Sequence, residues 1–135
     1  MTLVLSSGKV ADTGLAACFT REMKALSVRA PWSGMIASGR KTVEVRSRRT
    51  HFRGELLICQ SRGGGAMAVV ELLDCRPFIE ADDVASGGVW SKHSETHADH
   101  WAWELRLVRR VTSAPIKGKL SFYDVPDSEF RDAVA

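Results

Sequence analysis

Three side chains that could take part in acid–base chemistry lie within six residues of one another: Lys41, Glu44 and Arg46. A lysine that is partly removed from water can lose its proton near neutral pH and act as a base or a nucleophile. A carboxylate can position a water molecule, and an arginine can hold a phosphate or carbonyl oxygen with two hydrogen bonds. The group therefore indicates hydrolytic chemistry. The alternative is an ion pair of little energetic value next to a solvated lysine that contacts phosphate.

The pattern around this group predicts a strand that presents it. Val43 and Val45 alternate with Glu44 and Arg46, as expected for a strand with one apolar and one polar face. If the valines fill the core, the polar face lines a cleft. Lys41 comes just before this strand.

Other segments predict the frame of the domain. A short helix is expected at residues 31–38, with Pro31 in its first turn and Gly39 as its stop. Residues 79–87 read as a short helix or turn and residues 89–100 as a loop. Further strands are predicted at residues 24–29, 54–61, 66–75, 101–111 and 119–126. Five or six short strands with one or two helices predict an α+β domain on a curved sheet or small barrel, and a sandwich stays open.

The length of 135 residues fits a single domain, and 44% hydrophobic residues are typical of globular proteins. We expect an N-terminal extension at 1–22, the domain at 23–126 and a C-terminal tail at 127–135.

Three cysteines without a CxxC pair favour reduced thiols and a cytoplasmic location. The apolar runs are too short to span a membrane, so no membrane partner is expected. No cofactor is predicted.

The segment after the predicted strand is strongly basic. Residues 40–62 contain seven basic and two acidic residues, a local net charge of +5 against +3 for the whole chain. Arg48, Arg49, Arg53 and Arg62 therefore predict a rim that contacts the phosphates of a nucleic acid, and the alternative is a solvated turn. Trp32, next to a proline, is the tryptophan best placed to stack on an unpaired base, whereas Trp101 and Trp103 read as core residues.

The loop at 89–100 contains His93, His97 and His100. Their spacing could place three imidazoles on one helical face, as a metal site needs, but no partner cysteine or second motif accompanies them. We therefore predict no metal site. The alternatives are exposed histidines and a general acid or base, since the histidine pKa lies near working pH.

The order of motifs resembles the ASCH domain, the activating-signal-cointegrator homology family. Members show an early Pro-Trp helix, then G-x-K-x-x-E-x-R, then an aromatic-R-G-x-L-L-I strand. These motifs correspond here to Pro31-Trp32, Gly39–Arg46 and Phe52–Ile58. The similarity extends over about residues 24–126. It implies a PUA-like fold, a small β-barrel of five to six strands flanked by short helices, and work on RNA.

The resemblance also implies candidate roles for particular residues. The family includes RNA-binding modules, a proposed single-strand ribonuclease and amidohydrolases that remove the acetyl group of N4-acetylcytidine. The lysine that matches Lys41 is a catalytic candidate in the amidohydrolases, and a glutamate in the late loop corresponds best to Glu95, with Asp99 as a competitor. The position of Glu44 carries threonine in those amidohydrolases, so their mechanism does not transfer directly.

Three functions follow as alternatives. The first is a hydrolase that cleaves single-stranded RNA or a modified nucleoside with Lys41, Glu44, Arg46 and Glu95. The second is a non-catalytic RNA-binding module that uses the same cleft with steep salt dependence. The third, a module that binds a small molecule or a protein, has the least support. The expected partner is single-stranded RNA or a modified nucleoside, and the sequence gives no oligomeric state.

Overall fold

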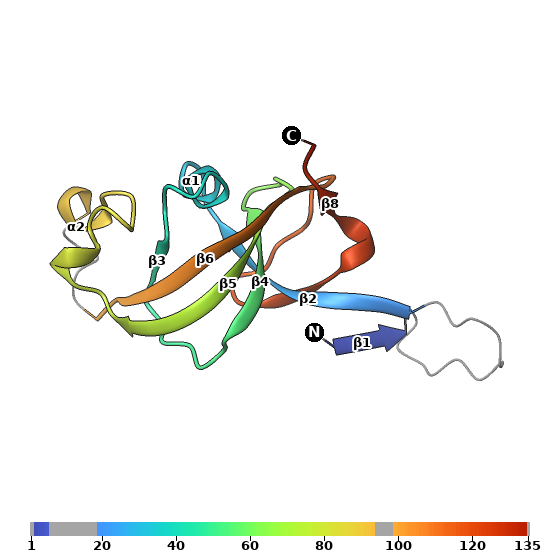
Figure 1. Cartoon of the computed structure of the whole chain (residues 1–135), viewed down its shortest axis with the longest axis horizontal. Helices are drawn as coiled ribbons and strands as arrows, with labels where there is room; N and C mark the ends of the chain where they lie inside the picture. Colours follow the sequence, from blue (N-terminus) through green and yellow to red (C-terminus); the bar gives the residue numbers. More distant parts are fainter. Residues whose placement is uncertain (1, 6–18, 94–98, 135) are drawn as a thin grey trace.

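The computed structural model describes residues 2–5, 19–93 and 99–134 of the chain. Within these ranges the chain forms eight strands, two α-helices and two short 3-10 helices (Figure 1). The strands are β1 (Thr2–Leu5), β2 (Phe19–Val28), β3 (Val43–Arg46), β4 (Gly54–Gln60), β5 (Ala66–Pro77), β6 (Trp101–Thr112), β7 (Tyr123–Pro126) and β8 (Arg131–Asp132). The helices are α1 (Trp32–Ala37), η1 (Glu80–Asp82), α2 (Val89–Lys92) and η3 (Asp127–Glu129).

The described strands join into one sheet. Its order is β1-β2-β4-β5-β6-β3, while β7 also pairs with β2 and β8 with β6. The β2–β4 pair is parallel and the other pairs are antiparallel. The consequence for function is that β3 pairs with β6 and with neither of its sequence neighbours, β2 and β4.

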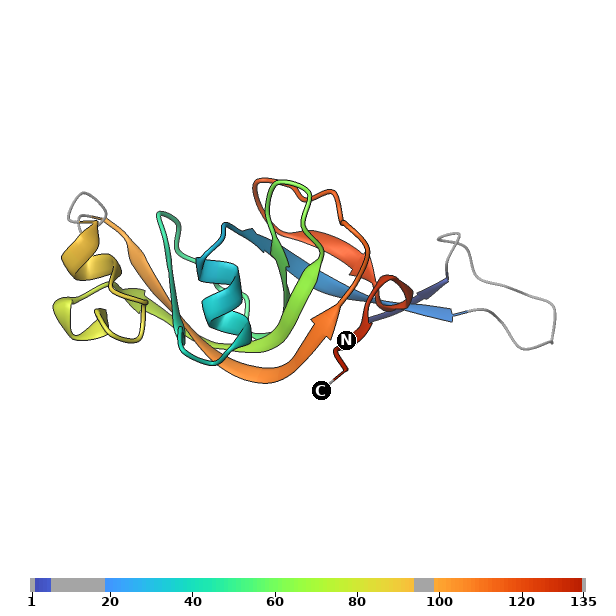
Figure 2. The ribbon, with the colours of Figure 1, turned by 90° about the horizontal axis from the view of Figure 1, so that it is seen from above.

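The long strands β5 and β6 curve around α1, so that the sheet curls into a half-barrel (Figure 2). Their pairing register shifts between Val69 and Val70 and again between Leu72 and Asp74. Such bulges bend a strand and increase its twist. The curled sheet therefore has a concave side that carries α1.

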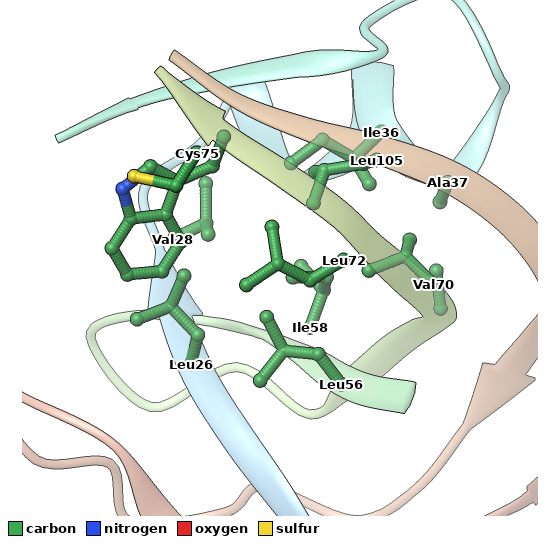
Figure 3. Packing of buried hydrophobic residues seen from close by; sticks show 12 residues of the cluster. Leu26, Val28, Ile36, Ala37, Leu56, Ile58, Val70, Leu72, Cys75 and Leu105 are labelled. Carbon is green, nitrogen blue, oxygen red and sulfur yellow. The ribbon is translucent and has the colours of Figure 1, made fainter. Parts of the chain in front are cut away.

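Alternate residues of the strands separate into two hydrophobic clusters, because successive side chains point to opposite faces of a sheet. On β4, Leu56 and Ile58 belong to the first cluster, whereas Leu57 and Cys59 belong to the second. Ile36 of α1 is in the first cluster, which covers the helix side of the sheet (Figure 3). The buried residues of the first cluster are Leu26, Val28, Ile36, Ala37, Leu56, Ile58, Ala68, Val70, Leu72, Cys75, Trp103 and Leu105.

A third, smaller cluster lies at the end of the molecule that carries α2. It contains Val43, Phe78, Val89 and Ala102, with Val45 packed against it. This cluster joins the segment that contains η1 and α2 to the first residues of β3. It explains why a polar stretch that reads as a loop forms a helical turn at Val89–Lys92.

Most predicted elements are confirmed. The helix at 31–38 is α1, and Gly39 follows it with a φ of +81°, the left-handed conformation that glycine adopts easily. The strand expected at 119–126 is shorter, because residues 113–122 form an irregular loop and β7 begins at Tyr123. The domain limits stay a prediction: β2 crosses the first limit, and Phe130 beyond the second packs into the second cluster.

Cys59 and Cys75 are free and buried. In the part of the chain that the structure describes, no helix is long and apolar enough to cross a membrane.

Candidate active site

The end of α1 fixes the backbone of Lys41. The N–H groups of Arg40 and Lys41 both donate to the carbonyl of Met35, each at 3.0 Å. Immediately afterwards, the N–H groups of Thr42 and Val43 donate to the carbonyl of Ala85, at 2.8 and 3.0 Å. Lys41 is therefore held between the helix end and the segment that precedes α2.

The side chain of Lys41 is almost completely buried, with 2% of the residue exposed. Its Nζ donates to the carbonyl of Ser86 at 2.5 Å and lies 3.5 Å from Oε1 of Glu44. The same ammonium lies over the ring of Trp32, 4.9 Å from the centroid. Burial lowers the pKa of Lys41 below its ordinary value, while the charge and hydrogen bond of Glu44 act in the opposite direction.

Glu44 bridges the two cations of the site. Its Oε1 faces Lys41, and its Oε2 lies 3.3 Å from NH1 of Arg46. Arg46 also donates to the carbonyl of Ser27 at 3.5 Å, and its guanidinium lies 5.9 Å from the ring centroid of Trp103. Glu44 is 6% exposed, whereas the side chain of Arg46 is 26% exposed. The Arg46 guanidinium thus remains partly accessible to a ligand.

Both faces of β3 are covered, which refines the expected division into a core face and a cleft face. Glu44 pairs with Trp103 and Val45 with Ala102 of β6. Cross-strand partners share a face, so Glu44 lies on the side of the first core cluster, and the valines pack in the third cluster instead. The polar triad therefore borders the main core, which accounts for its burial.

An open cleft of about 1140 Å³ begins at this triad. Lys41, Glu44 and Arg46 line it together with Trp32 and Arg62, so the structure brings five of the predicted site residues together. The remaining walls come from the end of β2, the turn after β4, residues around α2 and the loop before β7. The additional lining residues are Ser27, Val28, Arg29, Val45, Ser47, Ser61, Gly63, Val89, His93, His100, Pro115, Ile116, Lys117, Gly118, Lys119 and Leu120.

Of the predicted basic rim, Arg62 lines the cleft, while Arg48, Arg49 and Arg53 do not. Arg49 lies over the ring of Trp101, 5.5 Å from its centroid. Arg53 donates to the carbonyls of Thr50 and Phe52 at 3.0 and 2.8 Å, and so holds its own turn. The carbonyl of Arg48 accepts a hydrogen bond from the Trp103 indole at 3.1 Å.

Sequence reasoning missed three cations of the cleft: Arg29, Lys117 and Lys119. With Lys41, Arg46 and Arg62 they make six basic lining residues against one acidic residue, Glu44. Their positions are scattered through the sequence, so no local charge run marks them. The glycine between the two lysines lets their loop approach the end of β2 closely: a Cβ at Gly118 would lie 2.1 Å from the Ser27 Oγ.

The late loop is described only in part. Glu95 and His97 lie outside the described residues, while His93 and His100 line the cleft. The ring of His93 meets that of Trp32 edge-on, with centroids 5.9 Å apart. The competitor Asp99 is exposed and is not among the lining residues. Among the described side chains, no group of three or more His, Cys, Asp or Glu residues is arranged to hold a metal ion.

Comparison with known proteins agrees with this fold. No curated protein matches the chain. A crystal structure of a serine-to-alanine mutant of ZmASCH from Zymomonas mobilis matches with a TM-score of 0.52 at 18% identity, over 83% of this chain and 88% of that one. This likeness confirms the predicted α+β, PUA-like fold, a small barrel flanked by short helices, whose sheet is curled here into a half-barrel (Figure 2). The sequence pattern of the ASCH domain matches residues 26–115, two thirds of the chain. The chain therefore belongs to the ASCH domain family.

Proposed function

We propose that this protein binds single-stranded RNA or a modified nucleoside in the cleft and hydrolyses a bond of that ligand. The observation that carries the proposal is the array of buried Lys41 and Glu44 with the partly exposed Arg46, which together line an open, basic cleft. Six basic residues against one acidic residue favour an anionic ligand. The open cleft of about 1140 Å³ matches the upper end of ligand-pocket sizes, so a nucleoside or a short single strand fits it.

Each member of the array has a role that its surroundings support. Burial lowers the pKa of Lys41, so less free energy is needed to form the neutral amine that acts as a base or nucleophile. Glu44, in contact with both cations, orients the attacking water and takes part in proton transfer. Arg46 is partly accessible and stabilises negative charge that develops on the reacting carbonyl or phosphoryl oxygen. The bond cleaved is an amide on the base or a phosphodiester of the strand.

Trp32 and the apolar rim complete the ligand site in this proposal. Trp32 is half-buried at the cleft, so an unpaired base can reach its exposed edge. The fully exposed Leu120 and the partly buried Ile116, which also line the cleft, offer apolar surface. Glu95 remains a candidate participant on the basis of the family resemblance alone.

A specific observation favours a second function, a non-catalytic RNA-binding module. The Lys41 ammonium already has three partners, the Ser86 carbonyl, Glu44 and the Trp32 ring. A lysine with all its hydrogens engaged can serve to hold the cleft together. In that case the basic lining residues supply affinity and no bond is broken.

One experiment separates the two functions. The wild-type protein and the Lys41→Met and Glu44→Gln variants are incubated with a single-stranded RNA pool and with N4-acetylcytidine, and the products are identified by mass spectrometry. The matched control is Lys24→Met, because Lys24 also lies over aromatic rings, those of Phe52 and Phe122, but does not line the cleft.

The hydrolase function requires product from the wild type and the control, and a loss of about a hundredfold or more in both site variants. Intact substrate with every protein, combined with salt-sensitive RNA binding, would leave the binding module. Binding of neither RNA nor nucleoside would exclude both functions.

A further inference from the structure

Lys41 hydrogen-bonds to a backbone carbonyl 45 residues away, that of Ser86. A backbone carbonyl can position a lysine only if its own segment is fixed. Ser86 belongs to residues 79–89, which contain η1 and lead into α2. This segment is called the platform below. Arg76 of β5 holds this segment at the end of the sheet by binding Asp82 of the segment and Glu104 of β6.

We propose that Asp82, held by Arg76, is the positioning residue for Lys41. Arg76 lies near the end of β5 and grips Asp82 with two hydrogen bonds, NH1 to Oδ2 at 2.9 Å and NH2 to Oδ1 at 2.7 Å. The same guanidinium donates through Nε and NH2 to Oε1 of Glu104 on β6, at 3.1 and 3.0 Å. Arg76 thus joins the platform to both long strands.

Asp82 connects Arg76 to the backbone of the platform through its own hydrogen bonds. It is 4% exposed, and its Oδ2 also accepts the N–H of Ile79 at 2.9 Å. Burial alone would raise the pKa of Asp82, but the hydrogen bonds from Arg76 and Ile79 and the charge of Arg76 lower it below its ordinary value. Asp82 therefore stays ionised and paired at neutral pH. Its carbonyl accepts the N–H of Ser86 at 2.8 Å.

Ser86 is then fixed on every side. It is 0% exposed, its Oγ donates to the carbonyl of Asp83 at 2.9 Å, and that Oγ accepts the N–H of Val89 at 3.2 Å. The preceding carbonyl, that of Ala85, receives two N–H groups from the chain that leads into β3. An unbroken set of hydrogen bonds therefore runs from Arg76 through Asp82 and Ser86 to the Nζ of Lys41.

The proposal explains why the platform is built with buried charge. A buried carboxylate is costly unless it is fully paired, and Asp82 is paired twice and lies outside the cleft. If Asp82 loosens, the Ser86 carbonyl moves, and the Lys41 ammonium is no longer held against Glu44 and Trp32. The catalytic consequence rests on the proposed function, whereas the positioning of Lys41 does not.

The test measures the pKa of Lys41 directly, by NMR of protein labelled with ¹³C at the lysine ε-carbon. The resonance of Lys41 is the one absent from Lys41→Met. The variants are Asp82→Asn and Arg76→Lys. The second variant keeps the positive charge and loses the pair of hydrogen bonds that Arg76 donates to the Asp82 carboxylate. The matched control is Glu71→Gln, since Glu71 pairs with Arg106 across the same two strands but away from the cleft.

Both variants should raise the pKa of Lys41 toward its ordinary value, because a loosened platform admits water to the ammonium. The control should leave it unchanged. Removing the negative charge of Asp82 without movement would lower the pKa of Lys41 instead, so the sign distinguishes geometry from electrostatics. The other charged or titratable groups that line this cleft are retained in every variant: Glu44, Arg29, Arg46, Arg62, Lys117, Lys119, His93 and His100.

An unchanged or lowered pKa in Arg76→Lys overturns the proposal, and this variant decides the matter if Asp82→Asn does not fold. If the wild type is active, the variants should also lose about tenfold to a hundredfold in kcat with KM little changed. If the wild type turns over neither RNA nor nucleoside, the proposed function fails, and the NMR result still decides the positioning of Lys41.

Discussion

The cleft contains four exposed cations whose contribution to RNA binding can be estimated. They are Arg29 at the end of β2, Arg62 in the turn after β4, and Lys117 and Lys119 in the loop before β7. Within the described part of the chain, none of the four has a carboxylate partner. All four are therefore available to neutralise phosphates.

For a single strand, the logarithm of the binding constant falls by about 0.7 per neutralised phosphate for each tenfold rise in salt concentration. Four contacts predict a slope of about −2.8, so that affinity falls ~50-fold between about 50 and 200 mM salt. Replacing Lys119 by methionine should make the slope shallower by about 0.7. The assay is fluorescence anisotropy of a labelled oligouridine at several salt concentrations.

The control for this prediction is Arg48→Met, which removes one exposed positive charge from the basic turn outside the cleft. It should leave the slope almost unchanged, even though the sequence alone places Arg48 in the rim. A slope shallower than about −1 for the wild type would refute the assignment of the cleft as the RNA site. An equal effect of Arg48→Met and Lys119→Met would refute the division into cleft and non-cleft cations.

Ile58→Ala should lower the free energy of unfolding by about 2–5 kcal/mol, because Ile58 is 0% exposed in the first core cluster, and urea denaturation measures it. Gly118→Ala places a Cβ 2.1 Å from the Ser27 Oγ, so it should displace the loop before β7 and weaken RNA binding. The control Gly34→Ala should keep the affinity, because its Cβ would meet nothing within 4 Å, and equal affinities of the two variants would contradict this prediction. Burial raises the pKa of Tyr123 to about 12, so its absorbance should titrate near that value. Since the folded pKa exceeds the ordinary value of 10.0, the free energy of unfolding should fall as the pH rises between these two values.

The elements around the triad follow from local patterns. The alternation at 42–46 predicts β3, and Pro31 and Gly39 delimit a helix that the structure confirms as Trp32–Ala37. These signals act over one to four residues, through strand pleating and the conformations available to proline and glycine. The tryptophans of β6 are similar: alternation places Trp101 and Trp103 on the core face. Trp103 is buried in the first cluster, and the partly buried Trp101 packs against it.

The location of the cations did not follow from the sequence. A run of arginines after β3 predicts one continuous rim, but Arg49 and Arg53 are engaged with Trp101 and with their own turn. Lys119 falls in a segment predicted as a strand and Lys117 lies just before it, but both belong to the loop before β7. They reach the cleft because β7 pairs with β2. Charge composition gives the number of cations, whereas strand pairing decides which of them share a surface.

The sequence by itself determined the curved-sheet class, the family and the shared face of Glu44 and Arg46, because residues two apart in a strand point to the same side. The contact of Lys41 with Glu44 depends on the turn that leads from α1 into β3. Only the tertiary structure decided that Lys41 is buried and that its acceptor is the carbonyl of Ser86. That contact joins residues 45 apart, and it forms because β3 pairs with β6 and the platform closes over the end of both strands. Local propensity carries no information about such a pairing.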